Sequence, residues 1–362
     1  MARIGIIGAG QLGKMLGEAA EAVGAQCTFL DPAPAPPAAA AGPVIAGEFD
    51  DPAALADLAR VSDIITYEFE NVPVAPLREL ARRIPVLPSP EALYQAQDRV
   101  REKELFQHLD IPVADWLPVD TEAGLRDAAA RIGFPLVLKT RRFGYDGKGQ
   151  QLLQSASDIA PAMETFSGQR LVAEQWVAFD YEVSAIGARC ASGEQVCYPL
   201  TENTHREGIL RLSKAPAGSD ALLAQATGYL RRLMDHLDYV GVLALEFFAR
   251  NNKLLANEFA PRVHNSGHWT IEGAETSQFE NHLRAILGLP LGSTAPRGHA
   301  GMANLIGAMP DSPEFLLHGN GYLHDYGKTP RAGRKLGHIT LVESSAAARD
   351  AQLVALDKQL AP

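Results

Sequence analysis

Apolar residues alternate between short runs and helical spacing over roughly the first ninety residues. Residues 3–8 form an apolar run that predicts a buried strand, and a helix follows at Leu12, Met15, Leu16, Ala19 and Val23. Similar runs predict strands over 27–30, 63–67 and 86–87, a helix over 76–83, and a helix that Asp51 caps with Pro52 in its first turn. Alternating strands and helices indicate a parallel sheet with helices on both faces.

The pattern changes after a long amphipathic helix, which we expect around residues 91–109. Beyond it, the order is strand, glycine-rich loop, strand and helix, followed by longer apolar runs with hairpin signals. A second change falls in the Pro- and Gly-rich stretch 290–297, before predicted strands at 302–307, 322–326 and 336–342 and a terminal helix. The chain is therefore expected to divide near residue 95 and again within 290–297.

Composition and charge exclude several classes of protein. The chain has 362 residues, of which 46% are hydrophobic and 21% charged, as in folded proteins with more than one domain. Its formal net charge of -10 disfavours binding to nucleic acid or to an anionic membrane. We find no signal peptide and no apolar stretch of membrane-spanning length. Three cysteines without a CxxC pair fit a reducing compartment, so we expect a cytoplasmic protein.

A glycine motif follows the first predicted strand. Gly8, Gly10 and Gly13 have the spacing GxGxxG, and Asp31 ends the second strand about where a ribose-binding acid lies in dinucleotide-binding proteins. This arrangement allows a nicotinamide-dependent dehydrogenase without favouring it. The alternative is a tight turn from strand to helix whose amides bind a different anion, such as a substrate phosphate.

A basic, glycine-rich segment follows the apolar run 135–139. The run ends in Lys139, and residues 141–149 read RRFGYDGKG. The amides of such a loop can surround phosphate oxygens, and its basic side chains add positive charge. The segment lacks the GK[ST] ending of a Walker A loop. We expect a phosphate-binding loop, the alternative being a solvated flexible one.

Two apolar runs, 242–248 and 254–260, are separated by turn residues and predict a hairpin. Each run contains one carboxylate, so the hairpin can place Glu246 beside Glu258. A carboxylate in an apolar strand is unfavourable unless it is paired or holds a metal, and carboxylate oxygens suit Mg²⁺ that bridges nucleotide phosphates. The alternative is a salt bridge to Arg262.

Residues 262–268, with the sequence RVHNSGH, place several polar groups directly after Glu258. His264 and His268 are four residues apart, but Gly267 and the missing glutamate are not typical of a helical HExxH zinc site. We interpret the segment as a wall of a substrate site. The alternative is that its histidines lie in the core.

From about residue 3 to residue 343 the chain resembles the N5-carboxyaminoimidazole ribonucleotide synthases, which are ATPase subunits of phosphoribosylaminoimidazole carboxylase in the ATP-grasp superfamily. GYDGKGQ and APRVHNSGH are specific to this family. Departures from the family pattern occur at Asp325, where an aromatic residue is common, and at Phe143, where a smaller residue is frequent. The matching segments are GAGQLGKM (8–15), YEFENV (67–72), KTRRFGYDGKGQ (139–150), YPLTENTHREGILRLSKAP (198–216), NEFAPRVHNSGHWTIEGAETSQFENHLRAILGLPLG (257–292) and GRKLGHIT (333–340).

The resemblance implies a multidomain chain of α/β and α+β structure. It implies a Rossmann-like pre-ATP-grasp domain over 1–95, an ATP-grasp domain over 96–295 with a lid subdomain at about 115–177, and a small β-rich domain over 296–362. The implied reaction uses ATP, Mg²⁺ and bicarbonate to carboxylate 5-aminoimidazole ribonucleotide to N5-carboxyaminoimidazole ribonucleotide through carboxyphosphate, in purine (IMP) synthesis. The implied assembly is a homodimer.

Three alternatives stay open at this point. One is the NAD-dependent dehydrogenase, although the first domain of the resembled family carries no dinucleotide. Another is a nucleotide-binding module without turnover, which the intact Lys139, Glu246 and Glu258 disfavour. The third is a different ATP-grasp enzyme, such as biotin carboxylase or the formate-dependent glycinamide ribonucleotide transformylase, which the HNSGH segment disfavours.

The resemblance also implies a role for individual residues. The ATP-binding residues would be Arg99, Lys139, Gly144, Tyr145, Asp146, Gly147, Lys148, Gly149, Gln150, Glu174, Gln175, Trp176, Val177, Glu182, His205, Asn257 and Glu258. Mg²⁺ would be held by Glu246 and Glu258. The ribonucleotide would contact Gln11, Leu12, Glu70, Arg262, His264, Asn265, Lys328, Arg334 and Lys335. The catalytic residues would be Tyr145, Asp146, Lys148, His264, Asn265 and Lys328.

Overall fold

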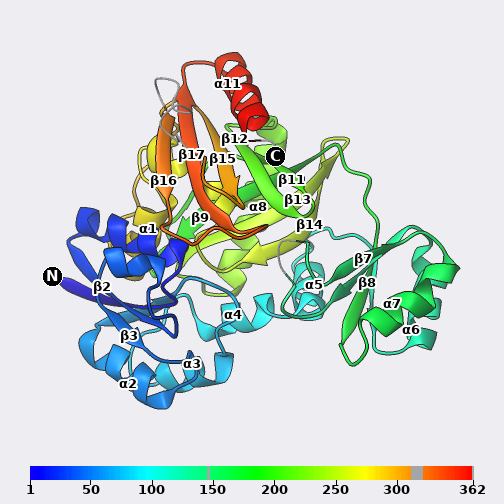
Figure 1. Ribbon diagram of the computed structural model, residues 1–362, viewed down its shortest axis with the longest axis horizontal. Coiled ribbons are helices and arrows are strands. Elements are labelled where there is room, and N and C mark those ends of the chain that lie inside the picture. Colours follow the sequence, from blue (N-terminus) through cyan, green and yellow to red (C-terminus); the bar gives the residue numbers. More distant parts are fainter. Residues whose placement is uncertain (145–146, 311–320, 361–362) are drawn as a thin grey trace.

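The computed structural model describes residues 1–144, 147–310 and 321–360. Figure 1 shows three bodies: an N-terminal body in blue and cyan at the lower left, a small green body at the right, and a large body of green to red elements above and between them. The site described below lies where these bodies meet.

The N-terminal body is built on a parallel sheet. Over the described residues this sheet has four strands, in the order β3-β2-β1-β4. All neighbouring strands are parallel, which confirms the predicted parallel sheet. As predicted, the side chain of Asp51 caps a helix by accepting a hydrogen bond from the Ala53 amide at 2.9 Å. The strand predicted at 86–87 is reduced to a bridge between Val86 and Ile65. The elements are β1 (Ala2–Ile7), α1 (Gln11–Ala19), η1 (Ala20–Val23), β2 (Ala25–Asp31), η2 (Pro37–Ala40), β3 (Val44–Ala46), α2 (Pro52–Val61), β4 (Ile64–Tyr67) and α3 (Val74–Leu80).

The prediction of a single long helix around 91–109 is wrong. The chain instead forms two helices, α4 (Pro90–Ala96) and α5 (Arg99–His108), with a break between them. Asp98 has extended backbone angles, and its side chain caps α5 by accepting from the Val100 amide at 3.0 Å. The Asp98 carboxylate also accepts two hydrogen bonds from Arg141. The break directs the first turn of α5 toward the site.

The small body is an antiparallel sheet covered by two helices. Within the described part of the chain its strand order is β5-β8-β6-β7. Leu125, Leu138, Phe166 and Leu171 belong to its separate apolar core. The elements are β5 (Trp116–Val119), α6 (Glu122–Ile132), β6 (Leu136–Thr140), β7 (Gln150–Leu153), η3 (Ala156–Asp158), α7 (Ile159–Thr165) and β8 (Leu171–Gln175).

The large body contains one continuous sheet of nine strands over the described residues, in the order β14-β13-β9-β11-β12-β15-β17-β16 with β10 beside β9. The predicted C-terminal strands extend this sheet, because β12 pairs antiparallel with β15. The elements are β9 (Tyr181–Arg189), β10 (Gln195–Cys197), β11 (Thr201–Arg206), β12 (Ile209–Ala215), α8 (Asp220–His236), β13 (Gly241–Arg250), β14 (Lys253–Ala260), η4 (Asn265–Gly267), α9 (Thr270–Gly273), α10 (Gln278–Ile286), β15 (His299–Ile306), β16 (Gly321–Asp325), β17 (Lys335–Glu343) and α11 (Ala346–Gln359).

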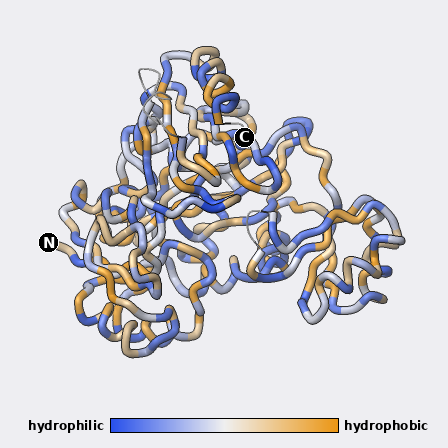
Figure 2. The backbone as a smooth tube through the Cα atoms, viewed as in Figure 1, coloured by the Kyte–Doolittle hydropathy of each residue, from blue (hydrophilic) through white to orange (hydrophobic). Residues whose placement is uncertain are grey.

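The N-terminal and large bodies share an apolar core. Met15 and Leu16 of α1 belong to the same buried cluster as Phe279 and Leu283 of α10. Figure 2 shows apolar segments, in orange, and polar segments, in blue, alternating along the chain in each body. Shared packing of this kind fixes the position of α1 relative to the large sheet. Among the helices of the described ranges, none has the length and apolar character to span a bilayer.

Candidate active site

Two glutamates lie opposite each other on adjacent strands of the large sheet. The predicted hairpin is confirmed as β13 and β14, whose turn residues Asn251 and Asn252 both adopt positive φ. Glu246 pairs with Glu258 in the register of this hairpin, as predicted. The register then shifts by one residue, and the bulge includes Asn257. The hairpin therefore brings two carboxylates and a carboxamide to one place.

The two carboxylates differ in their electrostatic environment. Glu258 accepts a hydrogen bond from Arg99 at 2.8 Å. Burial acts to raise the pKa of Glu258, but the positive charges of Arg99 and Lys139 outweigh burial and lower it. Burial and the negative charge of Glu258 raise the pKa of Glu246 to about 7. An added cation at this pair would therefore be favourable.

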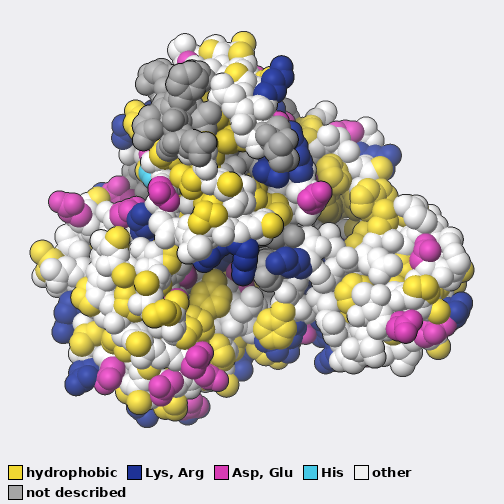
Figure 3. Space-filling view, in the orientation of Figure 1, with side chains coloured by type: hydrophobic (Ala, Val, Ile, Leu, Met, Phe, Trp, Pro, Cys, Tyr) yellow, Lys and Arg dark blue, Asp and Glu magenta, His cyan; other side chains and the backbone are white. Residues whose placement is uncertain are grey.

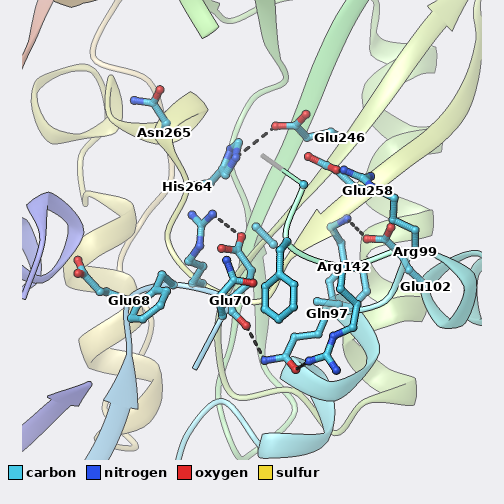
Figure 4. Close-up of a pocket in the computed structure, with 18 of the residues that line it drawn as sticks. Glu68, Glu70, Gln97, Arg99, Glu102, Arg142, Glu246, Glu258, His264 and Asn265 are labelled. Carbon is cyan, nitrogen blue, oxygen red and sulfur yellow. Dashed lines mark hydrogen bonds and ion pairs between the residues drawn. The ribbon is translucent and has the colours of Figure 1, made fainter. Parts of the chain in front are cut away.

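Arg262 pairs with Glu70 instead of the hairpin glutamates. Its guanidinium bonds the Glu70 carboxylate and also donates to the carbonyl oxygen of Val263 at 2.8 Å. The salt-bridge alternative for the hairpin pair is therefore wrong. His264 is the neighbour that points toward the pair, with its Nε2 3.2 Å from Glu246 Oε1 (Figure 4).

The donor atoms at the hairpin fit a hard divalent cation. Asn257 Oδ1 is buried and has no hydrogen-bond partner among the described residues. This oxygen and the carboxylates of Glu246 and Glu258 are the kind of ligand that Mg²⁺ prefers. Over the described ranges, no group of three or more His, Cys, Asp and Glu side chains could hold a metal ion. The three oxygen-bearing side chains suit an ion that takes its remaining ligands from a nucleotide and water.

Positive charge from two bodies converges beside Glu258. Lys139, at the end of β6, is buried, and its Nζ lies 2.9 Å from Glu174 Oε2. Burial lowers the pKa of Lys139, although the Glu174 carboxylate opposes that effect. Arg99 stands at the first turn of α5 and interacts with both Glu258 and Glu174. The structure therefore brings together the two cations predicted to hold ATP phosphates.

The residues predicted to contact adenine and ribose lie at the end of β8, directly after it, and on β9 and β11. Gln175 and Trp176 are exposed and Val177 is half-buried, where the chain leaves the small body. Glu182 Oε2 lies 2.7 Å from His205 Nδ1. Burial acts to lower the pKa of His205, but Glu182 and the charge of Glu246 outweigh it and raise the pKa. This ion pair therefore lies within electrostatic reach of the hairpin carboxylates.

The predicted phosphate loop connects β6 and β7 of the small body. Tyr145 and Asp146 lie outside the described residues. In the described part of the loop, Gly147 and Gly149 adopt positive φ, and a Cβ at Gly147 would lie 2.9 Å from the carbonyl oxygen of Glu207. Lys148 is exposed, Gly144 lines the cavity described next, and Gln150 begins β7. The loop thus passes close to the turn between β11 and β12 of the large body.

A cavity of about 410 Å³ joins the hairpin carboxylates to a second group of polar residues (Figure 4). In Figure 3, Lys and Arg side chains gather in the hollow where the three bodies meet. The cavity is lined by residues predicted for both substrates: Gln11, Leu12, Glu70, Arg99, Gly144, Glu246, Glu258, Arg262, His264, Asn265 and Lys335.

Two basic residues predicted for the ribonucleotide are placed differently from Lys335. The ammonium group of Lys328 contacts the side chain of Gln11, which itself lines the cavity. Arg334 donates from Nη1 to the carbonyl oxygen of Thr329 at 3.1 Å and does not occur among the described lining residues. Of these three basic residues, Lys335 alone is among the described residues that line the cavity.

The segment 262–268 divides between the cavity and the core. Arg262, His264 and Asn265 line the cavity. His268 is fully buried, and its ring packs against Phe279 and His338. The interpretation of the whole segment as a substrate wall is therefore wrong for His268, because this side chain points into the interior.

The glycine motif accommodates a carboxylate of the chain itself. Glu68 is buried and accepts hydrogen bonds from the amides of Gly10 and Gly13. A Cβ at Gly10 would lie 2.7 Å from Glu68 Oε1, so glycine is required there by the glutamate. Asp31 is also engaged, since its Oδ2 accepts from the Ala9 amide at 2.9 Å. These acceptors occupy the groups that a dinucleotide would need, which contradicts the dehydrogenase alternative.

Six further charged or polar residues line the cavity that the sequence analysis gave no individual role: Glu68, Asn71, Gln97, Glu102, Arg141 and Arg142. Gln97 donates to the carbonyl oxygens of Glu70 and Val72, and it accepts from Arg142 at 2.8 Å. A signal was present for Glu102, which lies three residues from Leu105 and four from Phe106 on α5. A charged residue on the apolar side of a helix indicates a buried polar site.

Comparisons with known proteins follow the same division of the chain. Residues 1–97 match the ribonucleotide synthetase preATP-grasp domain, residues 104–279 the ATP-grasp domain, and residues 300–352 the phosphoribosylaminoimidazole carboxylase C-terminal domain. The N5-carboxyaminoimidazole ribonucleotide synthase of Pseudomonas aeruginosa is 49% identical over 339 residues, which cover 94% of each chain. The chain belongs to the N5-carboxyaminoimidazole ribonucleotide synthase family. The resemblance drawn from the sequence motifs is thereby confirmed.

Solved N5-carboxyaminoimidazole ribonucleotide synthases have the same fold. The synthetase of Thermus thermophilus has a TM-score of 0.94 and 51% sequence identity, and the match covers 98% of each chain. The synthase of Aspergillus clavatus in complex with ADP and 5-aminoimidazole ribonucleotide has a TM-score of 0.92 and 32% identity, covering 99% of this chain and 98% of that one. The ATP-grasp fold class expected from sequence is confirmed.

Proposed function

We propose that the chain uses ATP and bicarbonate to carboxylate 5-aminoimidazole ribonucleotide, giving N5-carboxyaminoimidazole ribonucleotide, ADP and phosphate through carboxyphosphate in purine synthesis. The observation that carries the proposal is a single cavity that Glu246 and Glu258 line together with Arg262, His264 and Asn265. Relatives over 94% of the chain bear the name of this enzyme, which supports the same reaction.

ATP would lie between the small and large bodies. Arg99, Lys139 and the loop 144–150 supply cationic and amide groups for its phosphates, and the backbone of 174–177 supplies contacts for adenine. The pair Glu182 and His205 would serve the ribose side. Glu246, Glu258 and Asn257 would hold Mg²⁺, which offsets negative charge on phosphoryl oxygens during transfer.

His264 supplies a neutral hydrogen-bond donor at the reacting end of the cavity. Burial, assisted by Arg262 and Lys335, holds the pKa of His264 well below its ordinary value. Its Nδ1 accepts from the amide of Ser266 at 3.3 Å, which leaves the proton on Nε2, facing Glu246. A neutral imidazole in this position can donate a hydrogen bond to bicarbonate or to the carboxyl group that is transferred. Because it carries no positive charge, it does not attract other anions from bulk solvent.

The ribonucleotide would occupy the end of the cavity between the N-terminal body and β17. Its phosphate needs cationic partners, and Lys335 lines this end while Lys328 contacts Gln11. Glu70 is held by Arg262, so its second carboxylate oxygen is available to accept from ribose hydroxyls or the substrate amine. Leu12 supplies an apolar contact.

The glycine loop would exclude water from the reaction. Carboxyphosphate reacts with water, so a cover over the site has a chemical purpose. The loop passes near Glu207 and carries Gly147 and Gly149, whose positive φ values suit glycine. Tyr145, Asp146 and Lys148 on this loop remain proposed catalytic residues, together with His264, Asn265 and Lys328.

We further propose domains over 1–95, 96–295 and 296–362, with the lid at about 115–177, and a cytoplasmic homodimer. Family matches over 1–97, 104–279 and 300–352 support the division. The small body has its own apolar core, which supports its movement as a unit.

Phosphate release from ATP tests the reaction directly. Purified protein with ATP, Mg²⁺ and bicarbonate should release phosphate much faster when 5-aminoimidazole ribonucleotide is added, and the product should carry label from ¹⁴C-bicarbonate. Omission of each component in turn provides the controls. Release that ignores the ribonucleotide, or product without label, would contradict the assignment.

A further inference from the structure

Lys103 is a buried charge close to the proposed nucleotide site and outside the cavity. It lies on α5 one turn after Arg99, and its side chain is only 1% exposed. Its Nζ lies 3.1 Å from Glu174 Oε2, the same oxygen that Lys139 approaches at 2.9 Å. One carboxylate oxygen on β8 therefore receives one lysine from helix α5 and one from strand β6 of the small body.

Glu174 depends on these lysines for its charge. Its side chain is 5% exposed, and its other oxygen, Oε1, has no hydrogen-bond partner among the described residues. Burial acts to raise the pKa of Glu174, but Lys139, Lys103 and Arg99 outweigh burial and lower it to about 2. A buried carboxylate in this state is costly to leave without a cation.

Cations outnumber carboxylates around Glu174. Lys103 and Lys139 both approach its Oε2, and Arg99 interacts with Glu174 as well. Positive charge that one carboxylate does not fully offset is what an incoming phosphate group requires.

Because two lysines contact the same oxygen of Glu174, one of them can move away while the other still neutralises the carboxylate. If Lys139 turns to a nucleotide phosphate, Lys103 still neutralises Glu174. If Lys103 were absent, the same movement of Lys139 would strand a buried carboxylate. We propose that Lys103 is a positioning residue that neutralises Glu174 and thereby releases Lys139 to bind the nucleotide. This inference rests on the proposed use of ATP.

A buried lysine that serves only stability behaves differently from one that serves Lys139. In Lys103→Met the apolar side chain fills the aliphatic volume, while Glu174 keeps Lys139 as its partner, so no buried charge is left alone. We therefore expect the melting temperature of the ligand-free variant to equal or exceed that of the unchanged protein. Its affinity for ADP with Mg²⁺ should fall on the order of 10- to 100-fold.

A double variant separates the two roles. In Lys103→Met/Glu174→Gln the carboxylate that retains Lys139 is gone, so the affinity for ADP should recover most of the loss. The matched control is Lys214→Met, which removes a half-buried lysine paired with Glu202 at 2.7 Å elsewhere in the large sheet. This control should bind ADP as the unchanged protein does.

Isothermal titration of ADP with Mg²⁺, followed by steady-state kinetics, decides among the outcomes. Weaker binding with retained melting temperature, relieved in the double variant, supports the proposal. Unchanged ADP affinity in Lys103→Met, or a loss that Glu174→Gln does not relieve, overturns it while leaving the proposed function intact. If the unchanged protein fails to bind ADP or to use ATP, the proposed function and this inference both fall.

Discussion

The side chain of Gln278 forms hydrogen bonds with both the backbone amide and the backbone carbonyl group of His264. Gln278 Oε1 accepts from the His264 amide at 3.0 Å, and its Nε2 donates to the His264 carbonyl oxygen at 2.7 Å. The same nitrogen lies 3.3 Å from His268 Nδ1. Gln278 is fully buried at the start of α10. A core residue of α10 thereby sets the direction in which His264 meets Glu246.

Removing the carboxamide in Gln278→Leu should lower kcat more than it changes the KM for ATP. The variant leaves one amide and one carbonyl group of His264 unpaired, which costs about 1 to 3 kcal/mol each and frees the imidazole from its orientation. Gln225→Leu is the matched control, because Gln225 Oε1 also accepts from a backbone amide, that of Leu254 at 2.9 Å. Steady-state kinetics and melting curves of both variants make the comparison. Equal kcat losses in the two would reduce Gln278 to a stabilising residue.

Apparent Mg²⁺ affinity should rise between pH 6 and pH 8. The pKa of Glu246 is raised to about 7 by burial and by Glu258, so below that pH the ion must displace a proton. Activity titrated with Mg²⁺ at fixed ATP measures the effect. Glu246→Gln should remove most activity, whereas Glu202→Gln on the same sheet should keep it. A pH-independent Mg²⁺ requirement would exclude Glu246 as a ligand.

The same group affects stability without the ion. Its folded pKa of about 7 exceeds the ordinary 4.5, so the folded chain keeps a proton that the unfolded chain releases. The contribution of Glu246 to stability is therefore fully present below about pH 4.5 and declines as the pH rises to 7. Glu246→Gln should flatten this part of the pH dependence in urea unfolding of the metal-free protein. A slope identical to that of the unchanged protein would contradict the raised pKa.

Lys335→Ala should raise the KM for the ribonucleotide more than Arg334→Ala does. Lys335 lines the cavity, while Arg334 bonds the carbonyl oxygen of Thr329. Loss of one charge-assisted contact to the substrate phosphate costs about 1.5 to 3 kcal/mol, or roughly 10- to 100-fold in affinity. The KM for ATP should change little in either variant. A larger effect for Arg334 would restore the role that the sequence suggested for it.

Glu68→Ala should destabilise the N-terminal body, because two glycine amides lose a buried carboxylate partner. Loss of charge-assisted hydrogen bonds of this kind costs about 1.5 to 3 kcal/mol each at most. Asp63→Ala is the control: its carboxylate accepts from the Arg3 amide at 2.9 Å at the exposed end of the same sheet. Urea unfolding compares the two.

NADH should raise the melting temperature of neither the unchanged protein nor Asp63→Ala, and a clear rise would reopen the dinucleotide interpretation.

Local sequence patterns were sufficient for the hairpin and for the helix cap at Asp51. Apolar runs flanked by turn residues fixed the partners Glu246 and Glu258, since strand register follows from the turn. The break at Asp98 was missed because the apolar spacing continues across it on both sides. What holds Asp98 there is a distant contact, the paired hydrogen bonds from Arg141.

Residues that act through contacts far along the chain could not be found from one sequence. Glu68 meets Gly10 and Gly13 across 58 and 55 positions, and nothing near Glu68 in the sequence indicates an acceptor role. His268 was misplaced because its neighbours His264 and Asn265 do line the cavity, and the 3-10 turn at η4 rotates His268 inward. A polar side chain in the sequence does not by itself show whether it points into the cavity or into the core.

The pairing of β12 with β15 has a consequence for how the chain can be divided. Residues 212–215 pair with 300–303, so the C-terminal strands complete a sheet that begins with the ATP-side hairpin. A protein truncated before residue 299 would expose the length of β12 as a new edge, with unpaired amides and buried apolar side chains such as Leu210 and Ala215. Such an edge recruits strands from other molecules. Expression of residues 1–298 alone is therefore expected to yield aggregates, and adding residues 299–362 as a separate polypeptide should restore solubility by completing the sheet.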